Sequence, residues 1–125
     1  MDVTPLIPAE RQLIQAYGEG RFRIANAVYE GSVIVLPEHT LAWPVRALAE
    51  VTIESLAAVL SAEPKVELLL LGCGSAMAPL KRELRVAMRA RGVVVEAMDT
   101  GAACRTFNVL LSEERRAAAA LIALG

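Results

Sequence analysis

Long apolar runs and charge of one sign are both missing from this 125-residue chain. Apolar runs such as Leu68–Leu71 are far shorter than the roughly 20 residues of a bilayer-spanning helix, so we expect no membrane span. Thirteen Lys and Arg residues nearly balance fourteen Asp and Glu residues, which leaves a net charge of -1. Because no whole-molecule positive field attracts nucleic acid, we expect no nucleic-acid partner. The N-terminal sequence also lacks the basic and apolar segments of a signal peptide, which predicts a cytoplasmic protein.

Cysteine and histidine are scarce, which limits the chemistry available to the chain. Cys73 and Cys104 match no disulfide framework and no familiar metal-ligand spacing, so we interpret both as reduced thiols. A cysteine nucleophile needs a histidine base, and the only histidine, His39, lies in a predicted surface loop. Asp99 with Cys104 is therefore not a catalytic pair. We predict no catalytic residue, no metal site and no cofactor, which favours a protein that is not an enzyme; a redox pair of the two thiols is the less favoured alternative.

The residues that are abundant predict one α/β domain spanning residues 1–125. Hydrophobic residues make up 55% of the chain and aromatic residues only 4%, so the core must consist mainly of aliphatic side chains. Residues 1–15 are predicted to be an irregular N-terminal arm. An alternating segment at 22–28 and the β-branched segment Ser32–Leu36 are predicted to form a β-hairpin, and mixed three- and four-residue spacings predict a helix from Thr52 to just before Pro64.

The C-terminal half predicts a β-α-β-α-β unit over residues 66–124. Its predicted elements are a central parallel strand at Leu68–Leu71, a helix from Pro79 to Gly92, a strand at Val93–Val95 and a helix at 102–111. The last segment, Ala117–Leu124, is ambiguous, because alanine favours a helix and its position after a β-α-β-α series favours a strand. We predict a strand. The fold class is thus a three-layer α/β domain with a mixed central sheet, in which a hairpin and a helix precede the C-terminal unit.

A glycine-rich turn follows the central strand, where many α/β proteins bind phosphate. Gly72-Cys73-Gly74 supplies two glycines of the dinucleotide-binding pattern, and Glu96 supplies an acidic residue near the expected distance. Met77, however, occupies the position of the third small residue, and no Walker motif follows. The favoured interpretation is that both glycines allow torsions that other residues avoid. The alternative is a small-molecule site at which the amides of Ser75 to Met77, at a helix N-terminus, bind an anion.

A second polar turn is expected beside the first one. Arg105, Thr106 and Asn108 are predicted to form a buried hydrogen-bond network that anchors a helix; in the alternative, they form the lip of a cleft with Arg105 facing an anion. Together the two turns define the candidate cleft, whose residues are Gly72, Cys73, Gly74, Ser75, Asp99, Thr100, Arg105 and Asn108.

A basic stripe marks the helix predicted between the two turns. Its spacing is typical of a solvated helix face, although an acidic partner or anionic lipid head groups would also fit it. No aromatic residues interleave with the basic ones, so nothing indicates binding to RNA or single-stranded DNA. The stripe comprises Lys81, Arg82, Arg85, Arg89 and Arg91.

The order of several motifs resembles one family of small proteins. The motifs are Tyr-x-Gly-Ser-Val-Ile-Val-Leu-Pro at 29–37, Leu-Leu-Leu-Gly-x-Gly at 69–74 and Met-Asp-Thr-Gly-Ala-Ala-Cys-Arg-Thr-Phe-Asn at 98–108. The family includes the mitochondrial complex I assembly factor 3 and the adipogenesis-associated domain protein. The resemblance implies a three-layer α/β domain with a C-terminal strand, and a role in maturing a membrane respiratory complex through protein contacts. It implies no catalytic residues, and the absence of a mitochondrial presequence suggests a bacterial, cytoplasmic member.

Three functional hypotheses follow. The leading one is a non-enzymatic protein-binding module that assembles a membrane respiratory complex, with a complex subunit or the membrane-insertion machinery as its partner. The second is a small-molecule or nucleotide-binding protein that uses the cleft at the carboxyl ends of the parallel strands. The third is self-association into a homodimer through an exposed strand edge.

Overall fold

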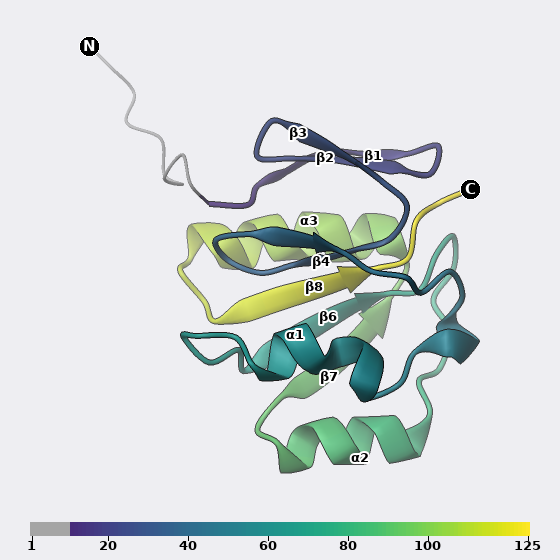
Figure 1. Cartoon of the computed structure of the whole chain (residues 1–125), viewed down its shortest axis with the longest axis vertical. Coiled ribbons are helices and arrows are strands. Elements are labelled where there is room, and N and C mark those ends of the chain that lie inside the picture. The colour runs from purple at the N-terminus through teal and green to yellow at the C-terminus, as the bar shows by residue number, and fades with distance from the viewer. Residues whose placement is uncertain (1–10) are drawn as a thin grey trace.

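Two β-sheets and three α-helices make up residues 11–125, the part of the chain that the computed structural model describes (Figure 1). The strands are β1 (Ile14–Gly18), β2 (Arg21–Ile24), β3 (Ala27–Glu30), β4 (Val33–Val35), β5 (Thr40–Ala42), β6 (Leu68–Gly72), β7 (Val94–Met98) and β8 (Ala117–Leu121). The helices are α1 (Ala57–Leu60), α2 (Arg82–Ala90) and α3 (Thr100–Ser112), with 3-10 turns at Leu48–Glu50 and Glu54–Leu56.

The larger sheet has five strands in the order β5-β4-β8-β6-β7. Strand β6 pairs in parallel with both β7 and β8, while β4 pairs antiparallel with β8 and β5. The predicted mixed α/β class and the C-terminal β-α-β-α-β unit are therefore confirmed. The alanine-rich segment is strand β8, as predicted, and it lies at the centre of the sheet, where all five of its residues are buried.

Side chains of the central strands alternate between two hydrophobic clusters, one on each face of the sheet. Leu69 and Leu71 join Leu84 and Met88 of α2 and Leu56, beside α1, on one face, whereas Leu70 lies on the other face. That second cluster contains residues of α3 and of the small sheet, namely Ile14, Phe22, Ile24, Ala103, Cys104, Phe107 and Leu111. The helices therefore cover both faces, which explains why β6 is apolar throughout its length.

The two crossover helices lie on opposite faces because β7 and β8 flank β6 on opposite sides. Helix α2 connects β6 to β7 and packs on the first cluster, and α3 connects β7 to β8 and packs on the second. The chain thus diverges at the carboxyl end of β6. In open α/β sheets this divergence is where ligands usually bind, so the turn after Gly72 occupies the position of greatest functional interest.

A separate three-stranded sheet, β1-β2-β3, packs beside α3 (Figure 1). The hairpin predicted between 22–28 and Ser32–Leu36 is wrong: β2 pairs with β1 and β3, and β4 joins the larger sheet. The reason is a two-residue turn at Ala25 and Asn26, both with positive φ angles of 50° and 68°, which reverses the chain earlier than we predicted. Of the predicted N-terminal arm, residues 1–10 lie outside the described residues, and β1 begins at Ile14.

Two predicted helices are shorter than expected. The segment from Thr52 forms a 3-10 turn and only one turn of α-helix, because Thr52 and Ser55 exchange side-chain to backbone hydrogen bonds and Pro64 disfavours helix before it. Helix α2 begins at Arg82 rather than at Pro79, since Lys81 has an extended backbone and Leu80 packs against the first cluster. Gly92, with φ of 84°, follows the end of α2 as predicted.

Candidate functional site

The two glycines of the turn after β6 are required for different physical reasons. Gly74 has a φ of 100°, a conformation that other residues avoid, as predicted. For Gly72 the same prediction is wrong, because Gly72 has no positive φ and ends strand β6; it is needed for space instead. A Cβ atom there would lie 2.9 Å from Oγ1 and 3.0 Å from Cα of Thr100, and 3.1 Å from Cδ2 of Leu121. Position 72 therefore has no room for a side chain, because the ends of β6 and β8 and the start of α3 pack closely there.

The side chain of Thr100 joins these three segments. Its hydroxyl is completely buried, accepts a hydrogen bond from the amide of Gly74 at 2.9 Å and donates one to the carbonyl oxygen of Ile122 at 2.7 Å. The backbone completes the arrangement, because the amide of Thr100 donates to the Gly74 carbonyl at 2.8 Å and the amide of Ile122 donates to the Gly72 carbonyl at 3.0 Å. We call these four residues, Gly72, Gly74, Thr100 and Ile122, the threonine knot.

The helix N-terminus at this edge belongs to α3 and not to the helix after the glycine turn. We expected the amides of Ser75 to Met77 to open a helix, which is wrong, because residues 75–81 are non-helical. At the start of α3, the Asp99 carboxylate accepts a hydrogen bond from the amide of Ala102 at 2.9 Å and so acts as the N-cap. Two of the amides that usually attract an anion, those of Ala102 and Thr100, are therefore bound to the Asp99 carboxylate and to the Gly74 carbonyl.

The polar residues of α3 connect the helix to the small sheet. The Asn108 side chain accepts a hydrogen bond from the amide of Ile14 at 2.9 Å and donates one to its carbonyl oxygen at 2.8 Å. One turn earlier, the Arg105 guanidinium donates to the hydroxyl of Tyr17 at 2.6 Å. The predicted anchoring network thus exists for these two residues, although Arg105 is exposed and no hydrogen bond of the Thr106 side chain is seen in residues 11–125.

The two cysteines belong to opposite faces of the sheet. Cys104 is buried in the second cluster, whereas the half-buried Cys73 packs against the first. Both thiols are free, as predicted, and no disulfide joins them. Burial raises the pKa of the Cys104 thiol from 9.0 to about 12, an effect that Arg105 opposes and Asp99 reinforces. A thiol with so high a pKa is protonated at neutral pH and is a poor nucleophile.

The structure brings together several of the predicted cleft residues through hydrogen bonds within the protein. Gly72, Gly74 and Thr100 form the threonine knot, Asp99 caps α3, and Cys73 donates weakly to backbone carbonyls 3.7 and 3.8 Å away. Ligand binding by these residues stays a prediction. Within residues 11–125, no group of three or more His, Cys, Asp or Glu side chains is placed to hold a metal ion.

The remaining sequence predictions concern the surface. His39 is exposed, as are the five residues of the basic stripe. Arg85 also donates to the Val95 carbonyl at 3.0 Å, so this member of the stripe ties α2 to β7. No helix in the described part of the chain has the length and apolar composition to cross a bilayer. Sequence reasoning missed a group of arginines at the opposite edge of the sheet, although the Arg115-Arg116 pair before β8 was a signal for it.

Comparisons with other proteins identify a family, sequence relatives and a solved structure that match most of this chain. The family described as "Protein of unknown function (DUF498/DUF598)" matches residues 14–122. An uncharacterised protein of Rhodobacter capsulatus is 41% identical over 87% of this chain and 82% of its own length. The Danio rerio NADH dehydrogenase [ubiquinone] 1 alpha subcomplex assembly factor 3 is 40% identical over 88% of this chain, which spans 63% of that protein. A Bordetella pertussis structure described as a Mth938-like domain is 30% identical, with a TM-score of 0.82, over 100% of this chain and 92% of its own.

Proposed function

Because this chain belongs to the DUF498/DUF598 family and is homologous to complex I assembly factor 3, we propose that it assists the assembly of a complex I-like respiratory complex. One observation carries the proposal: the 40% identity to the Danio rerio assembly factor extends over 88% of this chain. The match therefore covers the sheets and helices together, and not one isolated motif. Since the chain spans 63% of that relative, the proposal concerns the activity of the shared domain.

The proposed mode of action is protein binding without catalysis. The threonine knot uses its polar atoms to join strand ends and a helix, which is a structural task. The larger sheet, in contrast, presents an apolar side chain on its edge strand β7, where Val94 is 47% exposed. An exposed apolar side chain on an unpaired strand edge suits contact with another polypeptide. We expect the protein to act from the cytoplasm on subunits before they join the membrane complex.

Deletion of the gene in the source organism tests the proposed function. We expect lower NADH-dependent respiration in isolated membranes and accumulation of complex I subassemblies on native gels, with both defects repaired by the wild-type gene. Respiration on succinate is the matched control, because electrons from succinate bypass complex I. Normal complex I levels in the deletion strain would refute an assembly role.

The competing hypothesis of a small-molecule site needs a separate measurement. A thermal-shift screen of the purified protein against nucleotides and acidic metabolites tests it directly, because a ligand that binds only the folded state raises the melting temperature. We expect no stabilisation. A nucleotide that raises the melting temperature of the wild type, and does so less in a Ser75→Asp variant, would favour the cleft over the assembly role.

A further inference from the structure

Four segments that are distant in sequence meet at the amino edge of strands β6 and β8, opposite the threonine knot. They enclose a surface hollow of about 260 Å³. We call it the arginine hollow; its lining residues are Arg11, Pro37, Glu38, Pro64, Lys65, Val66, Glu114, Arg115 and Arg116. The floor is partly apolar, and three arginines outnumber the two glutamates of the lining, while the ammonium group of Lys65 is bound to the Arg91 carbonyl. This excess is local, because the whole chain has a net charge of -1.

Backbone contacts hold the walls of the arginine hollow in place. Glu114, just beyond the C-cap of helix α3, has a positive φ of 56°, and the amide of Arg115 donates back to the Leu110 carbonyl at 3.0 Å. The Arg116 carbonyl then accepts a hydrogen bond from the amide of Glu67 at 2.9 Å, which joins this wall to the segment before β6. On the other side, the amide of Gln12 donates to the Pro37 carbonyl at 3.3 Å. The hollow is therefore built on ordered main chain.

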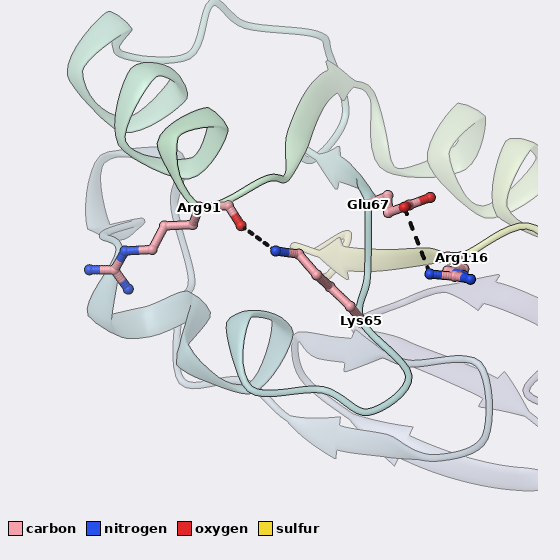
Figure 2. A network of polar contacts seen from close by, with 4 residues as sticks. All are labelled: Lys65, Glu67, Arg91 and Arg116. Carbon is pink, nitrogen blue, oxygen red and sulfur yellow. Dashed lines mark hydrogen bonds and ion pairs between the residues drawn. The ribbon is translucent and has the colours of Figure 1, made fainter.

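The arginines of the hollow are only partly neutralised by the chain itself. Arg11 pairs with Glu114 at 3.9 Å, and Arg116 pairs with Glu67 at 3.8 Å (Figure 2). Both distances exceed the roughly 2.7–2.9 Å of a charge-assisted hydrogen bond, so the guanidinium N–H groups keep free donors. Arg115 has no carboxylate partner within residues 11–125. Lys65 contributes its stem, because its ammonium group donates to the Arg91 carbonyl at 2.9 Å (Figure 2).

Arg11 is the least exposed arginine of the hollow. Its side chain is only 20% exposed, and charge interactions are screened less where water is excluded. Arginine also presents several donors in a plane that matches a carboxylate. The apolar floor, which includes Pro37, Pro64 and Val66, suits the methylene groups of a Glu or Asp side chain.

From this geometry we propose that the arginine hollow binds an acidic segment of a partner polypeptide, through carboxylates that pair with Arg11, Arg115 and Arg116. The inference rests on the proposed function, since it names the surface through which an assembly factor holds its client. Glu38 and Glu114 on the rim decide against a phosphate-rich ligand. The two glutamates repel a dense polyanion. A polypeptide instead brings single carboxylates, which fit between the two glutamates, and its basic residues can pair with those glutamates.

A titration of the purified 13.4 kDa protein tests the hollow directly. The probes are a short Glu-rich peptide, its Gln-for-Glu counterpart and inorganic phosphate, each followed through amide proton–nitrogen correlation spectra. We expect the Glu-rich peptide alone to shift the amides of Glu38, Lys65, Glu114 and Arg115, and added salt to weaken the effect. Shifts caused by phosphate and not by the peptide, shifts elsewhere on the surface, or no shifts at all would overturn the proposal.

A pair of charge-reversal variants controls the titration. Arg115→Glu should weaken peptide binding by about fivefold or more, because it removes an attractive charge and adds a repulsive one. Arg82→Glu is the matched control: Arg82 is exposed in the first turn of α2, where an acidic residue suits the helix dipole. Equal binding by the two variants would exclude the hollow. Melting temperatures within a few degrees of the wild type show that both variants fold.

Complementation of the deletion strain separates this inference from the proposed function. If the wild type and Arg82→Glu restore complex I and Arg115→Glu does not, both ideas are supported. If all three restore it, the assembly role stands and the arginine hollow is not the client surface. If deletion itself leaves complex I intact, the assembly role fails, and the peptide titration alone decides whether the hollow binds acidic polypeptide.

Discussion

The threonine knot predicts a large loss of stability when the Thr100 hydroxyl is removed. Thr100→Val keeps the size and the branching of the side chain but deletes one donor and one acceptor. The amide of Gly74 and the carbonyl oxygen of Ile122 then lose their partner in a fully buried position. The new methyl group would also occupy the place of an oxygen that lies 2.9 Å from the Gly74 nitrogen, which is too close for carbon.

The magnitude follows from the two hydrogen bonds. Each buried hydrogen bond contributes about 1 kcal/mol, and a buried donor left without a partner costs about 1–3 kcal/mol. We therefore expect the free energy of unfolding to fall by roughly 2–4 kcal/mol, a large part of the roughly 5–15 kcal/mol that stabilises a domain. For a chain of this length the melting temperature should fall by about 10 °C.

Urea unfolding followed by circular dichroism measures this loss, with two control variants. Thr106→Val removes a hydroxyl from the same helix at a half-buried position without a side-chain hydrogen bond in residues 11–125, and should change stability by about 0.5 kcal/mol or less. Thr100→Ser keeps the hydroxyl and should lose only about 1 kcal/mol. If Thr100→Val is no less stable than Thr106→Val, the knot does not support the edge of the sheet and our account of the turn is wrong.

Three further predictions follow from the structure. Asn108→Ala should cost about 1–3 kcal/mol and speed hydrogen exchange at the Ile14 amide, because both bonds between α3 and β1 are lost; unchanged exchange would contradict the anchoring role. Glu114→Gly should stabilise the protein by up to about 1 kcal/mol in urea, since φ of 56° strains any residue with a Cβ and the 3.9 Å ion pair that is lost has a carboxylate that is 80% exposed; a less stable variant would show that the pair with the half-buried Arg11 matters more. The folded state keeps the Cys104 proton while the unfolded state releases it, so between pH 9 and 12 stability should fall with rising pH by up to about 1.4 kcal/mol per pH unit. A Cys104→Val variant should lack this component in alkaline melts, and identical slopes for variant and wild type would refute it.

Several elements were predictable from local patterns because their causes are local. The continuous apolar run at Leu68–Leu71 indicates a strand that is buried on both faces. Gly92 marks the end of a helix, and this signal does not depend on what the helix packs against. By residue type, either Asp99 or Thr100 can cap the next helix, and the structure shows that Asp99 does so. The glycine-rich turn could be located in the same way, but its chemistry could not.

The errors occurred where strand partners had to be chosen. The sequence pattern indicated Ser32–Leu36 as the hairpin partner of the segment before it, yet β4 pairs with β8, whose partner residues lie 84 to 88 positions further along the chain. The positive φ angles of Ala25 and Asn26 reverse the chain at this point, and a turn of only two residues is difficult to identify from a single sequence. The starts of the helices near Thr52 and Pro79 were misplaced for a related reason, because packing and side-chain hydrogen bonds override helix propensity there.

The amino-acid sequence alone determined the order and type of the elements from Leu68 onward, because burial period, glycine and capping residues act over a few positions. Only the tertiary structure decided what those residues do for one another. Gly72 is required because Thr100 comes within contact distance from another element, and Lys65 and Arg115 line the same hollow only because strands β6 and β8 pair in parallel. These contacts arise because distant segments pack together across the sheet, and the periodicity of apolar residues in the sequence does not specify which distant residues meet.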